Sequence, residues 1–190
     1  LCKSYKKHIS TLLDPESLEL YNYLFKDFGF NDIVVLDRSK YEDNPYYKLL
    51  LKIKNYSKDN IEFRQNKVPS YVPVAINEKK YFKNAYFRDV TPTGMFKEDF
   101  YFPAIIQDEI TWMSFAPHET ETSEEAIKKA TGDVVTYGCG LGYFPYMASL
   151  KEDVKSVTIV ELDPKIIEFF KENLLPLFEH KEKIKIVNEN

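Results

Sequence analysis

The stretch VVTYGCGLGYFPY, residues 134–146, places three glycines on alternate positions directly after a short apolar run. The run at 133–137 has the composition of a buried strand, and a helix is expected to begin near Tyr143. A glycine has no Cβ, so the chain between strand and helix can adopt positive φ, and a ligand can lie against bare backbone. This strand, turn and helix constrain the fold more than any other feature of the chain.

The pattern around this turn predicts alternating strands and helices. Strands are expected at 133–137, 156–161 and 183–187, and Asp163 followed by Pro164 predicts the start of a helix that runs to about Leu175. Before the first strand, Thr122 and Glu125 form a capping-box pattern for a short helix that ends near Gly132. Strand, helix, strand, helix, strand predicts an α/β fold with a Rossmann-like, parallel, doubly wound sheet.

The preceding part of the chain has a different pattern. Asp14, Pro15 and Gly29 bound a predicted helix, 31–37 is a predicted strand, and 44–56 fits either a helix or a strand. From about 60 to 117, short aromatic and β-branched runs alternate with Pro, Gly and Asn, which predicts small antiparallel β structure or an irregular region. We therefore expect an α+β N-terminal region over 1–117 and a Rossmann-like cofactor-binding domain over 118–190.

The spacing of the glycines selects between two kinds of ligand. A dinucleotide fingerprint has the form G-x-G-x-x-G, and its third glycine lets the helix pack closely on the sheet. Counted from Gly138, that slot holds Tyr143, whose phenol would obstruct the packing. The observed G-x-G-x-G favours a ligand without a pyrophosphate, and a dinucleotide oxidoreductase is disfavoured.

A carboxylate completes the pattern. Glu161 lies 19 residues beyond Gly142, at the carboxyl end of the second predicted strand. Ligands of doubly wound sheets bind at that edge, and a carboxylate there can accept hydrogen bonds from the two hydroxyls of a ribose. The turn and Glu161 together predict an adenosine-type ligand with a free ribose diol.

The motifs GCGLGY and VELDP resemble motif I and the following acidic motif of class I S-adenosylmethionine-dependent methyltransferases. The resemblance covers about 119–190, and it implies that the cofactor is S-adenosylmethionine, with the three glycines along its methionine and ribose part, Glu161 at the ribose diol and Leu162 near the adenine. The end of the third strand, at 188–190, would approach the adenine edge. The implied cofactor-binding residues are Gly138, Cys139, Gly140, Leu141, Gly142, Glu161, Leu162 and Asn190.

The chain departs from this family at two positions. The acidic residue that usually lies two places before the first glycine is replaced by Thr136, and the acid that often follows the third strand has no clear counterpart, although Glu189 or Asn190 could serve. Substrate-selecting residues of this family usually follow a fourth strand. We therefore expect the domain to be truncated at its C-terminus, with its catalytic residues unknown and its catalytic elements outside this sequence.

Two other interpretations stay open. The pattern also resembles the aminopropyltransferases, such as spermidine synthase, which join an N-terminal β region to this sheet and use decarboxylated S-adenosylmethionine. A non-enzymatic α/β module that binds a regulatory nucleotide, or nothing, is the third alternative.

Several residues outside the two motifs have more than one possible interpretation. The segment before the first strand closes over the cofactor in related folds, so Trp112, Met113, Glu119 and Thr120 are candidates for a lid; alternatively the first two belong to the core and the others to a solvated lead-in to the helix. Cys139 is expected to be a small buried side chain and not a nucleophile.

Composition narrows the classes of partner. The formal net charge is −4, and the 26 basic residues are scattered among 30 acidic ones, so there is no strong nucleic-acid signal. No apolar run reaches the length of a membrane span, and two cysteines without a CxxC pair favour neither a disulfide framework nor a zinc site. We expect a cytoplasmic enzyme without a metal, acting on a small-molecule or protein substrate; oligomerisation stays open.

Overall fold

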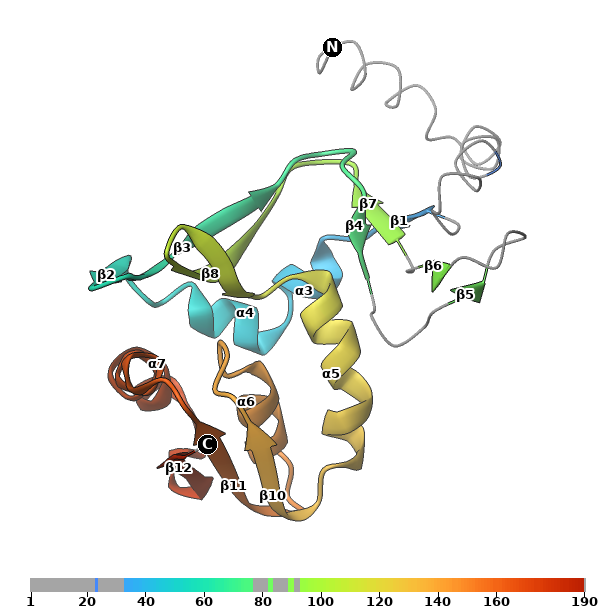
Figure 1. The fold of residues 1–190 in the computed structure, drawn as a ribbon. Coiled ribbons are helices and arrows are strands. Elements are labelled where there is room, and N and C mark those ends of the chain that lie inside the picture. The colour runs from blue at the N-terminus through green and yellow to red at the C-terminus, as the bar shows by residue number, and fades with distance from the viewer. Residues whose placement is uncertain (1–22, 24–32, 77–81, 84–88, 91–92, 190) are drawn as a thin grey trace. The chain divides into compact units, whose positions relative to one another are not determined.

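The computed structural model describes residues 23, 33–76, 82–83, 89–90 and 93–189 (Figure 1). The chain forms two compact units. The first unit comprises residues 1–41, 67–101 and 117–122, and the second comprises 42–66, 102–116 and 123–190. The predicted domain boundary at residue 118 stays a prediction.

The first unit contains a small mixed sheet. Its strands are β1 (Ile33–Leu36), β7 (Thr93–Phe96) and β4 (Val74–Ala75), with β7 in the middle, parallel to β1 and antiparallel to β4. The short strands β5 (Phe82–Lys83) and β6 (Asp89–Val90) pair with each other, and α3 (Ser39–Glu42) follows β1. The predicted strand at 31–37 is confirmed as β1, and the predicted helix at 14–28 lies outside the described residues.

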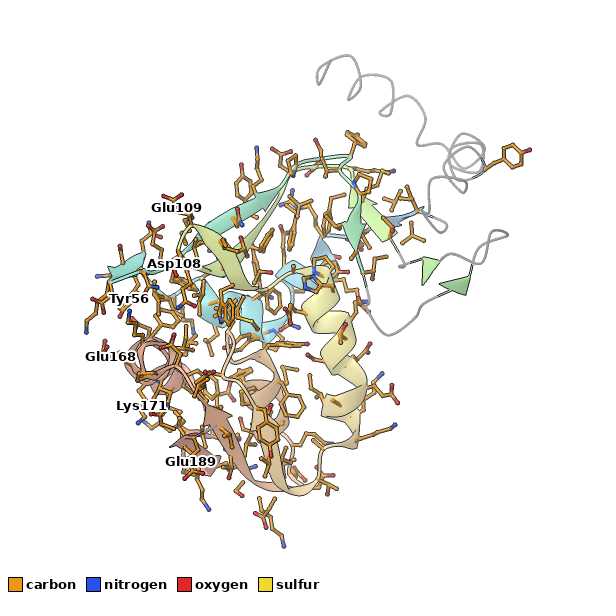
Figure 2. All side chains as sticks on the ribbon, in the orientation of Figure 1. Tyr56, Asp108, Glu109, Glu168, Lys171 and Glu189 are labelled. Carbon is orange, nitrogen blue, oxygen red and sulfur yellow. The ribbon has the colours of Figure 1, made fainter. Side chains whose placement is uncertain are left out.

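The β-rich region forms a four-stranded antiparallel sheet. Its strands, in spatial order, are β2 (Tyr56–Lys58), β3 (Ile61–Val68), β8 (Phe100–Gln107) and β9 (Ile110–Ser114). A two-residue turn joins β8 to β9, with Asp108 at φ 51° and Glu109 at φ 66° (Figure 2). Two positive φ values are the geometry of a type I′ turn, which matches the twist of the strands that it joins. The prediction of antiparallel β structure over 60–117 holds for this sheet.

The ambiguous segment 44–56 is helical at its start. Helix α4 spans Pro45–Leu50, and the Asn44 side chain caps it by accepting a hydrogen bond from the Tyr46 amide at 2.9 Å. Proline at the first helical position needs no hydrogen-bond acceptor, and its fixed φ suits a helix. The helix buries Tyr46, Tyr47, Leu49 and Leu50, so it contributes a large aromatic surface to the core of the second unit.

The glycine turn belongs to a parallel sheet in the second unit. Its strands, in spatial order, are β10 (Gly132–Tyr137), β11 (Val154–Glu161) and β12 (Ile184–Asn188). Helix α6 (Tyr143–Ser149) connects the first two strands. The second connection contains α7 (Pro164–Phe169), a π-helical turn (Phe170–Leu174) and 3₁₀ turns at Leu175–Leu177 and Lys181–Lys183. The predicted strands and helices from residue 133 onward are confirmed, and the chain is a mixed α/β protein with parallel strands, as a Rossmann-like fold requires.

The parallel sheet has one buried face and one open face. Val134, Val157 and Ile184 are register partners, and they pack with Ala148 of α6 in an apolar cluster. On the other face of β10, Val135 is 57% exposed and Tyr137 is 82% exposed. The alternation of strand side chains therefore directs α6 to one face of this sheet.

The capping-box prediction is wrong. Helix α5 spans Pro117–Lys129, so it begins five positions before Thr122, which lies inside the helix. Pro117 occupies the first turn and starts the helix without a side-chain cap on Ala116. A proline in the first turn was the stronger start signal. None of the helices among the described residues is long and apolar enough to cross a membrane.

Candidate functional site

The glycine turn follows β10 at the carboxyl edge of the parallel sheet. The Gly138 amide donates to Val160 O at 2.7 Å, and the Gly142 amide closes the turn on Cys139 O at 2.9 Å. Gly138, Gly140 and Gly142 have φ values of 84°, 51° and 82°, a backbone region that residues with a Cβ rarely adopt. The geometry of the turn therefore favours glycine at each of the three positions, most strongly at Gly138 and Gly142.

The spaces left by the missing Cβ atoms differ along the turn. A Cβ on Gly142 would meet Tyr46 Oη at 2.7 Å and Phe170 Cε2 at 2.8 Å, and a Cβ on Gly140 would meet Met113 Cε at 2.6 Å. Among the residues that the structure describes, a Cβ on Gly138 would have only Glu161 Oε2 near it, at 4.0 Å. Protein side chains therefore fill the space at two of the glycines, and Gly138 is the one whose backbone stays open.

Glu161 is the last residue of β11, and its carboxylate joins two loops. Oε2 accepts a hydrogen bond from the Cys139 amide at 2.7 Å, and Oε1 accepts from the amides of Leu162 and Asp163 at 2.8 and 2.9 Å. A carboxylate offers about four acceptor positions, two on each oxygen. The two positions of Oε1 are occupied, whereas Oε2 can accept one further donor on the side of Gly138.

The loop after Glu161 is held from two other elements. Asp163 caps α7 by accepting from the Lys165 amide at 2.8 Å through Oδ1, and its Oδ2 accepts from Gln107 Nε2 of β8 at 3.2 Å. Asn188, at the end of β12, donates through Nδ2 to the carbonyl oxygens of Glu161 and Leu162 at 2.8 and 2.9 Å. The predicted cap at Asp163 is confirmed, and these hydrogen bonds fix the backbone of the loop.

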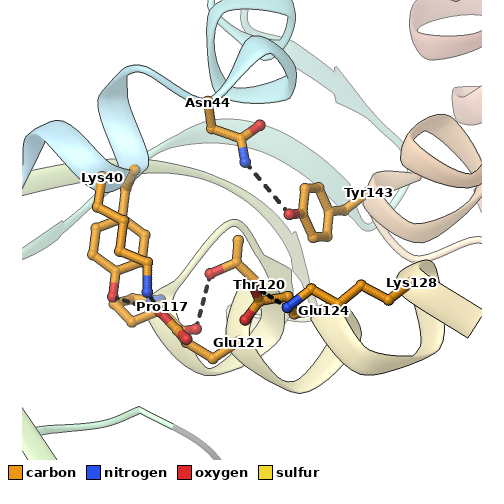
Figure 3. A network of polar contacts seen from close by, with 9 residues as sticks. Lys40, Asn44, Pro117, Thr120, Glu121, Glu124, Lys128 and Tyr143 are labelled. Carbon is orange, nitrogen blue, oxygen red and sulfur yellow. Dashed lines mark hydrogen bonds and ion pairs between the residues drawn. The ribbon is translucent and has the colours of Figure 1, made fainter. Parts of the chain in front are cut away.

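The far end of the turn is enclosed by aromatic side chains. Tyr46 Oη donates a hydrogen bond to Leu141 O, and the Tyr46 ring lies 4.8 Å from that of Tyr146 and 6.2 Å from that of Phe178, measured between ring centroids. Burial raises the pKa of the Tyr46 phenol well above 10.0, so the hydroxyl stays protonated as a donor. Tyr143 also contacts helix α4, because Asn44, which caps that helix, donates a hydrogen bond through Nδ2 to the Tyr143 hydroxyl at 3.4 Å (Figure 3).

Cys139 is buried and its thiol is unreactive in character. The residue is 2% exposed. Burial, with a further contribution from the negative charge of Glu161, raises the pKa of the thiol from 9.0 to about 12. A nucleophilic cysteine requires a lowered pKa and access to solvent. The prediction that Cys139 is a small buried side chain is confirmed.

The four candidates for a lid differ in their exposure and in their contacts. Trp112 is 61% exposed on β9, so its assignment to the core is wrong, whereas the neighbouring Met113 extends its methyl group to Gly140. Thr120 is buried in the first turns of α5, where its hydroxyl donates to Pro117 O at 2.9 Å (Figure 3). Glu119 is half-buried and pairs with His118 at 3.4 Å. Met113 is the candidate that directly contacts the glycine turn.

The remaining predicted site residues have the following places. The Leu141 side chain is buried, and Leu162 is 63% exposed with its amide on Glu161. Asn190 lies outside the described residues. Sequence analysis did not single out Tyr46, Gln107 or a bridging role for Asn188, because each acts on a segment distant in the chain. Among the described residues, no group of three or more His, Cys, Asp and Glu side chains could hold a metal ion.

Comparison with known proteins finds similarity to solved structures alone. No protein-family model matches the chain. No curated protein matches it either. Among solved structures, the chain is similar to spermidine synthase from Thermotoga maritima, with 17% sequence identity and a TM-score of 0.37 over 73% of this chain. The match spans 41% of that structure's chain, and at this identity and TM-score it does not bear on the activity of this protein.

Proposed function

We propose that the parallel sheet binds an S-adenosyl cofactor and that the protein is a transferase, with residues 118–190 as its cofactor-binding part. The observation that supports this proposal is the exposed backbone of Gly138 beside the Glu161 carboxylate. The glycine there presents backbone without a side chain, and Glu161 Oε2 has capacity for one further hydrogen bond. A ribose hydroxyl fits both features, because it is a small donor attached to a ring that can lie on bare backbone.

The other residues would complete the site in distinct ways. Leu162 is exposed beside Glu161 and offers an apolar surface to a nucleobase. Met113 lies against Gly140 and would border the part of the ligand that extends from the ribose along the turn. The structure carries no negatively charged group at Thr136, so a positively charged amino group would need another partner.

Methyl transfer is the chemistry that the motif resemblance favours. A bound S-adenosyl sulfonium would supply a methyl carbon whose leaving group is a neutral thioether. The residues of this chain would hold the nucleoside, fix the direction of the methyl group and exclude water from one side of it. Nothing in the described residues assigns a general base, and none is needed when the nucleophile carries no proton to be removed.

Aminopropyl transfer is the second candidate. The observation that favours it is the antiparallel sheet of β2, β3, β8 and β9, which precedes the parallel sheet in the chain. The aminopropyltransferases that the motifs resemble join a β region to this sheet in the same order. Here too a nucleophile displaces a thioether, so Gly138 and Glu161 would have the same role and only the transferred group would differ.

A calorimetric titration tests the proposal. S-adenosylhomocysteine is titrated into the 190-residue chain, into Glu161→Gln and into Glu152→Gln, an exposed carboxylate before β11 that serves as the matched control. We expect binding that Glu161→Gln weakens by about 1–3 kcal/mol, the range for loss of a charged acceptor, and that Glu152→Gln leaves unchanged. NAD serves as the ligand control.

Two outcomes would contradict the proposal. Absence of binding by S-adenosylhomocysteine would overturn it, and so would equal affinity in wild type and Glu161→Gln when thermal unfolding shows both to be folded. If binding is seen, a titration with decarboxylated S-adenosylmethionine separates the two chemistries, because a preference for it over S-adenosylmethionine supports aminopropyl transfer.

A further inference from the structure

The side chain of Asn188 bridges the loop that carries Glu161. Its two Nδ2 hydrogens point to two successive carbonyl oxygens, Glu161 O at 2.8 Å and Leu162 O at 2.9 Å. The orientation of the amide follows from chemistry, since the reverse orientation would place Oδ1 against two other acceptors. Asn188 is also the register partner of Glu161 in the parallel pairing of β11 and β12, so the side-chain bridge starts from the residue beside Glu161 in the sheet.

The carbonyl groups that Asn188 holds belong to the peptide units that aim the carboxylate. The amide of Leu162 shares a peptide plane with Glu161 O, and the amide of Asp163 shares one with Leu162 O. Those two amides are the donors to Glu161 Oε1. When Asn188 holds the two carbonyl groups, it therefore also directs the two amides toward Oε1, which turns Oε2 toward Cys139 and Gly138.

We infer that Asn188 is a positioning residue for ribose recognition, which acts by fixing the direction of the Glu161 carboxylate. This inference rests on the proposed function, because it assigns to Asn188 a share in how that site recognises a ribose hydroxyl. Asn188 needs no contact with the ligand for this role. The specific consequence is a loss of discrimination between ribose and 2′-deoxyribose when the bridge is removed, in addition to a loss of affinity.

The first experiment measures that discrimination. Dissociation constants for adenosine and 2′-deoxyadenosine are compared in wild type, Glu161→Gln, Asn188→Leu and Asn188→Gln. Leucine keeps the approximate size of the side chain but has no donor, and glutamine retains the amide donors. We expect wild type to prefer adenosine by about tenfold or more, the effect of one hydrogen bond to a charged group. In Asn188→Leu the ratio should fall toward that of Glu161→Gln, and Asn188→Gln should recover part of it.

A matched control separates positioning from general loss of stability. Asn173 Nδ2 donates to a backbone carbonyl, Phe169 O, at 3.1 Å in the π-helical turn after α7. Asn173→Leu removes a bond of the same chemical kind, and it should leave the ratio of the two dissociation constants unchanged. The double variant Asn188→Leu with Glu161→Gln should show no further loss of discrimination beyond Glu161→Gln alone, because the two side chains act on one interaction.

The second experiment needs no ligand. Amide hydrogen exchange is measured by NMR at Leu162 and Asp163 in wild type and Asn188→Leu, with Ile159 in the middle of β11 as the internal reference. We expect exchange at the two loop amides to accelerate by about threefold to tenfold, corresponding to the weakening of an ordinary hydrogen bond, and exchange at Ile159 to stay unchanged.

The two experiments distinguish failure of the inference from failure of the proposed function. If wild type binds neither nucleoside and does not bind S-adenosylhomocysteine, the proposed function fails, and the amide exchange alone decides whether Asn188 directs Glu161. If wild type prefers adenosine but Asn188→Leu retains the same ratio and the same exchange rates, the role of Asn188 is overturned and the proposed function stands. Unchanged exchange at both loop amides overturns the inference in either case.

Discussion

The two ends of the glycine turn look alike in sequence and differ in surroundings. At Gly142 a Cβ would meet Tyr46 Oη, Phe170 and Phe178 at 2.7–3.3 Å, so the glycine permits close packing of aromatic side chains. At Gly138 a Cβ would approach only Glu161 Oε2, at 4.0 Å, among the described residues. One glycine therefore serves the core of the second unit, and the other leaves an open backbone beside a carboxylate.

This difference changes how a glycine motif should be interpreted. The G-x-G-x-G spacing was taken as one ligand-binding feature, but the space at its last glycine is already occupied by protein. Only the first half of the motif, with Glu161, has the open backbone and the acceptor capacity that a ligand requires. Substitutions at the two ends should therefore separate into a loss of stability and a loss of binding.

The largest effect on stability is expected from Gly142→Ala. An alanine would have to adopt φ near 82°, and its Cβ would overlap the surrounding aromatic atoms. Together these costs amount to about 2–5 kcal/mol of the free energy of unfolding. Urea unfolding followed by circular dichroism measures the difference, and a loss smaller than about 1 kcal/mol would show that the cluster adjusts freely.

Gly138→Ala should reduce ligand affinity more than it reduces stability. Its positive φ of 84° would cost about 1–2 kcal/mol of stability, because the backbone is unfavourable but the space is free. The added methyl group lies where the ribose would rest, so affinity for S-adenosylhomocysteine should fall by at least about tenfold. Calorimetry on the folded variant checks this, and unchanged affinity would show that the ligand does not lie on Gly138.

Tyr46→Phe removes a single buried hydrogen bond at the packed end. The variant keeps the ring but leaves Leu141 O without its donor, which should cost about 1–3 kcal/mol of unfolding free energy. Affinity for S-adenosylhomocysteine should be unaffected in the folded protein. If binding weakens while stability is unchanged, the packed end of the turn also contributes to the site.

The smallest effect on stability is expected from ionisation of the Cys139 thiol. Its pKa in the folded chain, about 12, lies above the value of 9.0 for a free thiol, so the folded state disfavours the thiolate. Below pH 9 the thiol is protonated in both states, and its contribution to the free energy of unfolding is fully present. As the pH rises from about 9 toward 12, the thiol ionises first in the unfolded chain, so this contribution is lost. Iodoacetamide labelling, followed by mass spectrometry of the Cys139 peptide, should be at least about tenfold slower in the folded than in the unfolded chain at pH 9. Equal rates would mean that the thiol is exposed and ionised.

The local signals of the parallel sheet were sufficient to predict it. The apolar runs, the turn glycines and the Asp163–Pro164 start signal each act within a few residues, and β10, β11, β12 and α7 were found where these signals lie. The capping box at Thr122 failed because Pro117 provides a competing start signal five positions earlier. Local patterns thus predict elements well, and they fail where two such signals compete.

The side chains that lie against each glycine of the turn could not be predicted from local sequence. Tyr46 precedes Gly142 by about half of the chain, and no pattern near either residue indicates that they meet. The same holds for Met113 at Gly140 and for Asn188 at the Glu161 loop. The place of Glu161 beside the glycine turn was predictable, because the end of a parallel strand next to such a turn is a position defined by local sequence.

The most direct test of the account is to map where an S-adenosyl ligand binds. Backbone amide resonances of the chain are followed by NMR during titration with S-adenosylhomocysteine. The account predicts saturable shifts that are largest at Gly138, Cys139 and Leu162, smaller at Gly142, and abolished or strongly weakened in Glu161→Gln. Shifts centred elsewhere in the chain, or none at all up to millimolar ligand, would contradict the assignment of Gly138 and Glu161 to the cofactor site.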